Sequence, residues 1–252
     1  MRQAEKAIRF ADLHQKGNPV VLYNIWDAAG AKALAEAGAP AVATGSWSVA
    51  AAHGYEDGEA IPLDFVLRIT ERICASVDLP VSVDFEGGYA TEPAEVAENV
   101  RRIIHAGAVG INLEDGIVRG EGLHSVSSQA ARIRAIRSVA AEEGIPLVLN
   151  ARTDLFLDSD PATHKAHLAE ALEREAAYGE AGADCFFVPG LTESSLISRI
   201  VDGAKLPVNV LMMGELKAIR DVAALGVSRA SYGPGPFRRF LADFRKAYAG
   251  SL

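Results

Sequence analysis

The chain has 252 residues and a formal net charge of −8, and 49% of its residues are hydrophobic. An acidic chain without a basic run excludes a typical nucleic-acid or anionic-membrane partner. No apolar run approaches the roughly 18 residues that cross a bilayer. The length matches a single α/β barrel of about 250 residues. No linker rich in proline or serine interrupts the chain, so we expect one domain over residues 1–252.

Cysteine usage favours a reducing compartment. The chain has two cysteines, Cys74 in a helical pattern and Cys185 at the start of an apolar run, and both are expected to be buried thiols. No zinc-type spacing is present. The N-terminus leads into an amphipathic pattern and does not resemble a signal sequence. We therefore expect a cytoplasmic protein.

A helical pattern, a glycine and an apolar run recur in that order around Gly38, Gly107, Gly182 and Gly226. Glycine commonly follows the last residue of a helix, so each copy is half of a βα unit. The eight predicted strands are residues 20–25, 41–45, 81–85, 110–114, 147–152, 185–189, 208–212 and 229–233. The predicted helices are residues 4–16, 27–38, 63–77, 93–107, 127–143, 161–181, 192–202, 214–225 and 236–249.

This alternation predicts a (β/α)8 barrel of the TIM type. A doubly wound open sheet is the second choice, but no Gly-x-Gly-x-x-Gly follows the first strand. In such barrels the chemistry lies at the carboxyl ends of the strands. Charged and polar residues gather at those ends in this sequence, which favours a functional site there.

The third strand ends in two carboxylates, Asp84 and Glu86, followed by Gly87 and Gly88. Side chains two apart on a strand point the same way. Glu114 ends the neighbouring strand, and three carboxylates packed without a cation would repel one another. A divalent ion held partly through waters resolves this, and oxygen ligands favour Mg²⁺, or Mn²⁺ in its place, over zinc. The alternative is a solvated loop after a core strand.

Two further strand ends suggest substrate contacts. Arg152 ends an apolar strand and needs a carboxylate partner, either that of the substrate or that of a neighbour such as Glu114. Gly45 and Ser46 can offer N–H groups and a hydroxyl to an anionic substrate. Asp115 has a less specific interpretation, because it can simply orient a neighbour.

A polar loop with two glycines, residues 117–128, follows Glu114 and is typical of a mobile lid. It contains Arg119 and His124, although an ordinary surface histidine is the commoner interpretation of His124. The pattern places three other histidines on helix surfaces: His14, His164 and His167.

Taken together, the strand ends resemble the isocitrate lyase and phosphoenolpyruvate mutase superfamily over nearly the whole chain. No one segment is very specific, but all occur in one order. The segments are Asn24-Ile25-Trp26-Asp27, Thr44-Gly45-Ser46-Trp47-Ser48, Gly54-Tyr55-Glu56-Asp57, Asp84-Phe85-Glu86-Gly87-Gly88-Tyr89, Asn112-Leu113-Glu114-Asp115, Asn150-Ala151-Arg152-Thr153-Asp154 and Gly226 through Pro234.

The resemblance implies a barrel whose last helix is exchanged between subunits of a homo-oligomer, a tetramer or a dimer. It implies Mg²⁺ held by Asp84, with Glu86 and Glu114 helping through waters. The substrate would be a small α-oxo or α-hydroxy acid. The residues that would bind it are Gly45, Ser46, Trp47, Arg152 and Asn209.

Two departures from the family pattern affect the expected activity. The second aspartate of the metal motif is Glu86 here. The lyases that cleave isocitrate or methylisocitrate carry a catalytic cysteine in a Lys-Lys/Arg-Cys-Gly-His lid, whereas this lid reads Arg119-Gly120-Glu121-Gly122-Leu123-His124. The Lys-Thr-Asn of the mutase lid is also absent, and Pro189 stands where the mutases have a histidine.

We therefore expect a Mg²⁺-dependent carbon–carbon lyase or decarboxylase that acts on a small α-oxo or α-hydroxy di- or tricarboxylic acid through a metal-stabilised enolate. The candidate catalytic residues are Arg152, Glu114, His124 and Arg119. One alternative is a P–C bond enzyme of the phosphonopyruvate hydrolase, phosphoenolpyruvate mutase or carboxyphosphonate phosphorylmutase type. Another is a catalytically degenerate barrel that binds a metabolite.

Overall fold

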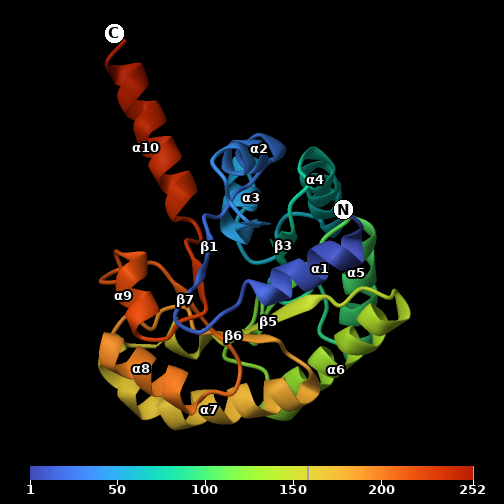
Figure 1. Ribbon diagram of the computed structural model, residues 1–252, viewed down its shortest axis with the longest axis vertical. Coiled ribbons are helices and arrows are strands. Elements are labelled where there is room, and N and C mark those ends of the chain that lie inside the picture. The colour runs from blue at the N-terminus through green and yellow to red at the C-terminus, as the bar shows by residue number, and fades with distance from the viewer. Residues whose placement is uncertain (158, 252) are drawn as a thin grey trace.

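A computed structural model describes residues 1–157 and 159–251 of the chain and shows one barrel (Figure 1). Its eight strands are parallel and lie in the order β1-β8-β7-β6-β5-β4-β3-β2. A bridge between Ile25 and Thr44 joins the two edges and nearly closes the sheet. The strands are β1 (Val20–Leu22), β2 (Val42–Ala43), β3 (Val81–Asp84), β4 (Gly110–Glu114), β5 (Val148–Arg152), β6 (Cys185–Phe187), β7 (Val208–Leu211) and β8 (Arg229–Ser231).

The prediction of a (β/α)8 barrel is confirmed, and each predicted strand is present. Most predicted strands were too long at their carboxyl ends: residues 185–189 were expected where β6 is Cys185–Phe187. The residues beyond are still buried, as Val188 is, and the Val188 N–H still donates to the Asn209 carbonyl of β7 (3.1 Å), but the regular strand has ended. Apolar patterning reports burial and not strand pairing, so it missed where the strands turn into the loops of the site.

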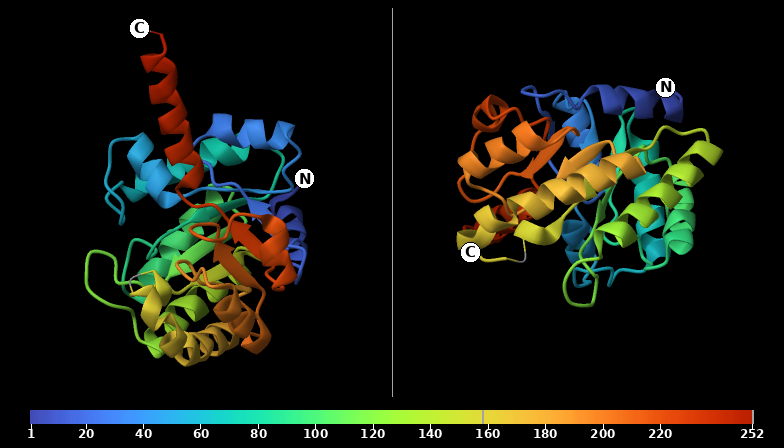
Figure 2. Two further views of the ribbon diagram at one scale, coloured as in Figure 1. Left: turned by 90° about the vertical axis from the view of Figure 1, so that its left-hand side faces the viewer. Right: turned by 90° about the horizontal axis from the view of Figure 1, so that it is seen from below.

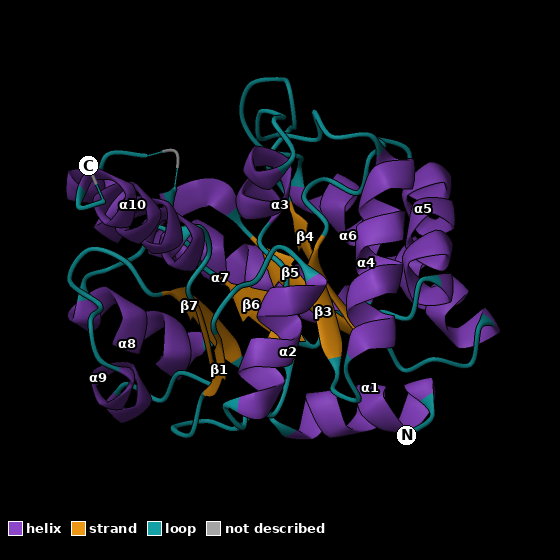
Figure 3. Ribbon diagram, turned by 90° about the horizontal axis from the view of Figure 1, so that it is seen from above, coloured by secondary structure: helices purple, strands orange, loops and turns teal. Residues whose placement is uncertain are grey.

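Helices surround the strands on the outside, as Figure 3 shows. They are α1 (Gln3–Asp12), α2 (Ala28–Glu36), α3 (Ser46–Ala52), α4 (Leu63–Ser76), α5 (Pro93–His105), α6 (Val126–Glu142), α7 (His164–Ala181), α8 (Ser194–Gly203), α9 (Ile219–Ala224) and α10 (Gly235–Ala249). Short 3-10 helices occupy Asp154–Phe156 and Pro161–Thr163. The sequence patterns did not predict α3, and α9 is shorter than the expected residues 214–225.

The four repeat glycines behave as expected. Gly38, Gly107, Gly182 and Gly226 follow helices and have φ values of 86°, 101°, 108° and 82°. This left-handed conformation is costly for other residues, which explains why a glycine stands at these four helix-to-strand turns.

Helix α1 closes the amino-terminal end of the barrel. Its Phe10 is fully buried and packs in one cluster with Val20, Leu22 and Val148, which belong to the strands. A larger apolar core lies between the strands and the surrounding helices, from β3 round to β8. The site described below therefore lies at the open, opposite end.

Helix α10 extends away from the barrel (Figures 1 and 2). Near its start, Phe237 and Phe240 contact Trp26. Further along, Phe244 and Tyr248 are each 66% exposed. No helix of residues 1–157 and 159–251 is long and apolar enough to cross a membrane.

Three side chains differ from the expected burial. His164 is buried, with its ring against that of Phe156 from the 3-10 helix Asp154–Phe156, and His14 is partly buried. Cys74 is only partly buried, whereas Cys185 is buried as expected. Burial raises the pKa of both thiols to about 12, so neither is a thiolate at neutral pH.

His14 should make the fold sensitive to acid. Its Nδ1 donates to the Phe10 carbonyl (2.8 Å), and burial lowers its pKa to about 4. Between this value and the ordinary value of about 6.5, the unfolded chain binds a proton that the folded chain does not, so stability falls as pH falls. His14→Phe should reduce the stability lost between pH 6.5 and 5 by up to about 2 kcal/mol. Urea unfolding at both pH values measures this.

His167→Phe is the matched control, because His167 lies on α7 and its ring forms no hydrogen bond with a carbonyl among residues 1–157 and 159–251. If wild type and His14→Phe lose the same stability between the two pH values, the acid sensitivity has another origin.

Candidate active site

A cavity of about 300 Å³ lies at the carboxyl ends of the strands. Its polar lining residues are Asn24, Ser46, Asp57, Asp84, Asn112, Arg152, Ser231 and Arg238. Its apolar lining residues are Trp47, Leu157, Phe187, Pro189, Leu211 and Met213. The cavity therefore offers charges of both signs beside an apolar wall, as a site for a small organic anion requires.

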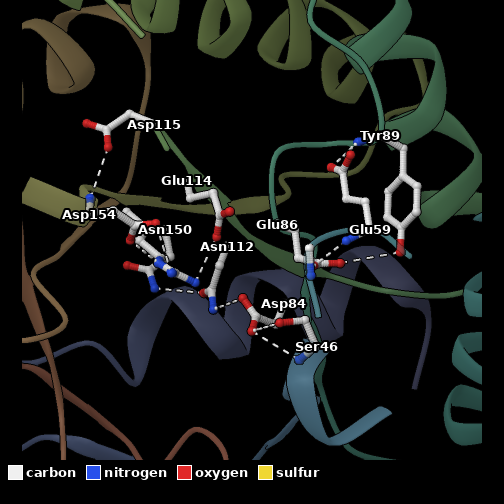
Figure 4. Close-up of polar contacts among 12 residues, drawn as sticks. Ser46, Glu59, Asp84, Glu86, Tyr89, Asn112, Glu114, Asp115, Asn150 and Asp154 are labelled. Atoms are coloured by element: carbon white, nitrogen blue, oxygen red, sulfur yellow. Dashed lines mark hydrogen bonds and ion pairs between the residues drawn. The ribbon is translucent and has the colours of Figure 1, made fainter. Parts of the chain in front are cut away.

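Asp84 is the carboxylate that the fold holds most firmly at this cavity (Figure 4). Its Oδ2 accepts hydrogen bonds from the Ser46 backbone N–H (3.1 Å) and hydroxyl (2.8 Å). Its Oδ1 accepts from Asn112 Nδ2 (3.0 Å). Ser46 begins α3, so this helix is placed to fix the carboxylate on one side while β4 fixes it on the other.

Glu86 is bound to a neighbouring loop. Its Oε1 accepts from the backbone N–H groups of Gly58 (3.0 Å) and Glu59 (2.9 Å), and its Oε2 accepts from the Tyr89 hydroxyl (3.4 Å). It does not line the cavity in the part of the chain that the structure describes. The structure thus gives Glu86 a clear loop-anchoring role, and its help to a metal ion stays a prediction.

Backbone strain is concentrated around this anchor. Four non-glycine residues in the described ranges have positive φ: Glu59 (58°), Glu86 (51°), Tyr89 (58°) and Arg119 (59°). They contact one another: Glu59 accepts from the Tyr89 N–H (2.7 Å), and Arg119 donates to the Glu59 carbonyl (2.6 Å). Left-handed backbone at non-glycine residues costs free energy, and such strain gathers at functional sites.

Arg152 lines the cavity and is paired with two carboxylates. Its Nη1 lies 2.8 Å from Glu114 Oε2, and its Nη2 donates to Asp154 Oδ2 (2.9 Å). The expected pair with Glu114 is present, while the pair with Asp154 was not expected. Asp115 accepts from the Asp154 N–H (3.0 Å) and orients that neighbour, as the less specific interpretation predicted.

Three carboxyl groups at or near the cavity have raised pKa values, so their ionised forms are disfavoured. Burial raises the pKa of Glu86 to about 7, and the charges of Asp84 and Asp57 add to this. Burial also raises the pKa of Glu114, against the effect of Arg152. The pKa of Asp57 is raised by partial burial and by the charge of Asp84. A divalent cation would relieve this crowding of negative charge.

The donor set fits Mg²⁺ in its chemistry, because it consists of oxygen ligands. In residues 1–157 and 159–251, no three acidic, histidine or cysteine side chains converge closely enough to ligate one ion directly. Of the three predicted ligands, Asp84 is among the described residues that line the cavity, whereas Glu86 and Glu114 are not. Water molecules would have to complete the shell, which is common for Mg²⁺.

The lid loop does not bring its candidates to the cavity. His124 lines a separate hollow with Glu59, Tyr89 and Arg132. Arg119 donates to the carbonyls of Gly58 (3.1 Å) and Glu59. The loop is thus tied to the same strained segment that Glu86 anchors, and the catalytic roles expected of His124 and Arg119 gain no support from the geometry.

Asn209 lies inside the barrel and not on the cavity surface. It is fully buried, and its Nδ2 lies 3.2 Å from the Ser231 hydroxyl. Ser231 itself lines the cavity.

By contrast, Gly45, Ser46 and Trp47 line the cavity. The donors expected to face an anionic substrate have partners within the protein: the Gly45 N–H donates to the Ile25 carbonyl (3.1 Å), and the Ser46 N–H and hydroxyl donate to Asp84. The substrate-binding role of these three residues stays a prediction.

Sequence reasoning missed two charged residues of the cavity, Asp57 and Arg238. The family resemblance included Asp57 within the segment Gly54 through Asp57, but no role was predicted for it. Its position beside Gly58 in a polar segment could have indicated a functional loop. Arg238 lies in the first turn of α10, with its guanidinium carbon 4.7 Å from the centre of the Trp47 ring. No local pattern marks Arg238, because only the direction of α10 brings it to the cavity.

Comparison with known proteins gives a consistent assignment. The family model described as phosphoenolpyruvate phosphomutase matches residues 10–252. The chain belongs to the isocitrate lyase and phosphoenolpyruvate mutase superfamily. The 2-methylisocitrate lyase of Salmonella typhimurium is 31% identical over 92% of this chain and 80% of its own length. The oxaloacetate decarboxylase of Paraburkholderia xenovorans is 28% identical over 88% and 73%.

Solved structures of this superfamily agree in fold. A candidate phosphonomutase from Burkholderia cenocepacia superposes with a TM-score of 0.97, at 41% identity and with full coverage of both chains. A phosphonopyruvate hydrolase in complex with oxalate and Mg²⁺ has a TM-score of 0.85 at 22% identity, over 99% and 86% of the two chains, which shows likeness of fold alone. The relatives with named activities are enzymes, and lyases are among them.

Proposed function

We propose that this superfamily member is a Mg²⁺-dependent enzyme that breaks a carbon–carbon bond next to the oxo or hydroxy group of a small di- or tricarboxylic acid. The observation that carries the proposal is the rigidly held Asp84 carboxylate beside a cavity with cationic and apolar walls. A bound Mg²⁺ would act as a Lewis acid on the substrate oxygens and would stabilise a pyruvate-like enolate.

The first carboxylate of the substrate would bind at Arg152, near the start of α3. Gly45, Ser46 and Trp47 lie at the start of α3, and Arg152 lines the same cavity. Arg152 is held by Glu114 and Asp154, so its guanidinium is oriented before a substrate arrives. Such preorganisation avoids an entropic cost on binding and supports a role for Arg152 in orienting the carboxylate.

The second anionic group would lie near Arg238. This guanidinium forms no ion pair with a carboxylate among the described residues, whereas Arg152 already has two. An arginine at the cavity that stacks on Trp47 suits a distal carboxylate. The apolar side chains of Phe187, Leu211 and Met213 would pack against the carbon atoms between the two ends.

Protonation of the enolate requires an acid other than a cysteine. Both cysteines lie outside the cavity lining of the described chain, and His124 lines a separate hollow. Asp57 lines the cavity, and partial burial together with the charge of Asp84 raises its pKa. Its position makes it our candidate for the acid, acting on the enolate directly or through a water molecule. Among the possible reactions, decarboxylation requires the fewest catalytic groups, because CO₂ leaves without the help of an acid.

Carbon–carbon chemistry is favoured over P–C chemistry by the balance of charge. A phosphonate carries up to two negative charges and needs several cations. Within the described residues, the arginines that line the cavity are Arg152, which two carboxylates neutralise, and Arg238. The named relatives 2-methylisocitrate lyase and oxaloacetate decarboxylase point the same way.

Pyruvate release is the direct test of the proposed lyase. The protein is incubated with oxaloacetate, methylisocitrate, dimethylmalate or phosphonopyruvate, each with Mg²⁺ or with a chelator. Release from one of the carbon substrates is expected with Mg²⁺ and not with the chelator. Asp84→Ala should reduce the rate to that of free Mg²⁺, because the ion then has no anchored ligand at the cavity.

Asp84→Ala is also the necessary blank, since free Mg²⁺ promotes oxaloacetate decay. Release from phosphonopyruvate alone would assign the protein to P–C chemistry. Unchanged activity and Mg²⁺ binding in Asp84→Ala would contradict the proposed site.

Arg238→Leu tests the distal carboxylate. For a dicarboxylate substrate, this change should raise KM about tenfold or more, because a charge-assisted hydrogen bond is lost. The value of kcat should change less, because the interaction is present in the ground state as well. The control is Arg239→Leu, which removes an equal charge from the next position of α10 and does not line the cavity. Equal KM values for the two variants would contradict the assignment.

We also propose that α10 docks on another subunit, in a dimer or a tetramer. Phe240 and Phe244 stack on each other at 6.0 Å, and Tyr248 continues the same face along an exposed helix. Such an apolar face on a projecting helix is costly in water. Exchange of the helix between subunits would cover it.

The double variant Phe240→Ser/Phe244→Ser should dissociate the oligomer, as measured by sedimentation velocity or by light scattering after size exclusion. Lys246→Ser, on the opposite face of α10, should leave the mass unchanged. If the wild type is monomeric, or if the double variant keeps the wild-type mass, this face of α10 is not the interface.

A further inference from the structure

Arg229 is a buried cation inside the barrel that the proposed chemistry does not use. It lies on β8 two residues before Ser231, which lines the cavity, and its side chain is fully buried. Its guanidinium carbon lies 5.8 Å from the centre of the Phe10 ring. The buried ion pairs among the described residues are formed by Arg152 and Arg174 instead.

A buried guanidinium without a counter-charge is expensive, because desolvation is not repaid. Burial lowers the pKa of Arg229 to about 10, which still leaves it protonated at neutral pH. An apolar residue would fill the barrel at a lower cost. The presence of arginine at this position therefore calls for a reason other than stability.

The contacts of Arg229 lead to the candidate metal ligand. Its Nη2 donates to Asn112 Oδ1 at 3.0 Å. The same oxygen accepts from Asn150 Nδ2 at 2.8 Å, and Asn112 Nδ2 donates to Asp84 Oδ1 at 3.0 Å (Figure 4). One amide side chain thus connects the buried cation to Asp84.

The direction of these hydrogen bonds is fixed by the chemistry of arginine. A guanidinium can only donate, so the Asn112 atom that faces it must be the amide oxygen. The amide nitrogen then faces Asp84 and donates to it. Asn150 cannot fix the direction in the same way, because its own amide can turn to present either a donor or an acceptor. If the Asn112 amide turned, its oxygen would face the carboxylate and repel it.

We propose that Arg229 is a positioning residue that acts through Asn112 to hold Asp84 in the orientation that binds the divalent ion. This inference rests on the proposed function, because it assumes a Mg²⁺ site at Asp84. Ser46 holds the other carboxylate oxygen, so loss of the Asn112 contact frees one side of Asp84 only.

The test is Mg²⁺ binding by isothermal titration calorimetry on four proteins: wild type, Arg229→Met, Asn112→Ala and the double variant. Arg229→Met removes the donor and retains an unbranched side chain. It should weaken Mg²⁺ binding by about tenfold, in the range seen for residues that orient metal ligands. In the Asn112→Ala background, the same change should have little further effect, because the amide through which Arg229 acts is gone.

The melting temperature separates positioning from a general structural role. Replacement of a buried unpaired cation by an apolar side chain should leave Tm unchanged or raise it, while Mg²⁺ affinity falls. Arg229→Lys, which retains a side chain that only donates, should recover part of the affinity. If Arg229→Met does not fold, Arg229→Gln replaces it in the same four-protein comparison, because a glutamine amide cannot fix the direction of Asn112.

The possible outcomes separate a failure of this inference from a failure of the proposed function. If wild type binds no Mg²⁺, the proposed function fails and the inference fails with it. If wild type binds Mg²⁺ and Arg229→Met binds it equally well, the inference alone is wrong. It is also wrong if the loss is equal with and without Asn112, because Arg229 would then act by another route.

Discussion

The site depends on one carboxylate that is fixed on both of its oxygens. Asp84 accepts from Ser46 on one side and from Asn112 on the other. A carboxylate at the end of a short strand would otherwise rotate freely about its side-chain bonds. These contacts come from β4 and from the start of α3. The fold of the barrel therefore also orients Asp84, the candidate metal ligand.

A second arrangement surrounds the first and concerns the loops. Glu86, Glu59 and Arg119 tie three loops together through side-chain contacts to backbone groups, at the cost of left-handed backbone in all three residues. Such strain persists only where the surrounding contacts enforce it. The loop of residues 117–128 is therefore attached to the segment that also supplies Asp57 to the cavity.

The polar side chains inside the barrel are accounted for by the proposed positioning of Asp84. Barrel interiors are usually filled by bulky aliphatic side chains. Here Asn150, Asn209 and Arg229 are fully buried inside the barrel, and Asn112, which lines the cavity, is almost fully buried. A network of this kind is costly unless its members are hydrogen-bonded, and it specifies orientation when they are. Stability at the amino-terminal end comes instead from Phe10 and the apolar cluster around it.

The sequence by itself determined the barrel, its eight strands and the face that carries the chemistry, because burial, helix ends and turn glycines are local properties of the chain. It also singled out Asp84, Arg152 and the pair Gly45 and Ser46, although not the helix α3 that begins there. Only the tertiary structure decided that Glu86 anchors a loop, that Asp57 and Arg238 reach the cavity, and that Arg229 contacts Asn112. These facts depend on side-chain direction and on contacts between residues more than a hundred positions apart, such as Arg229 and Asn112, which no local pattern encodes.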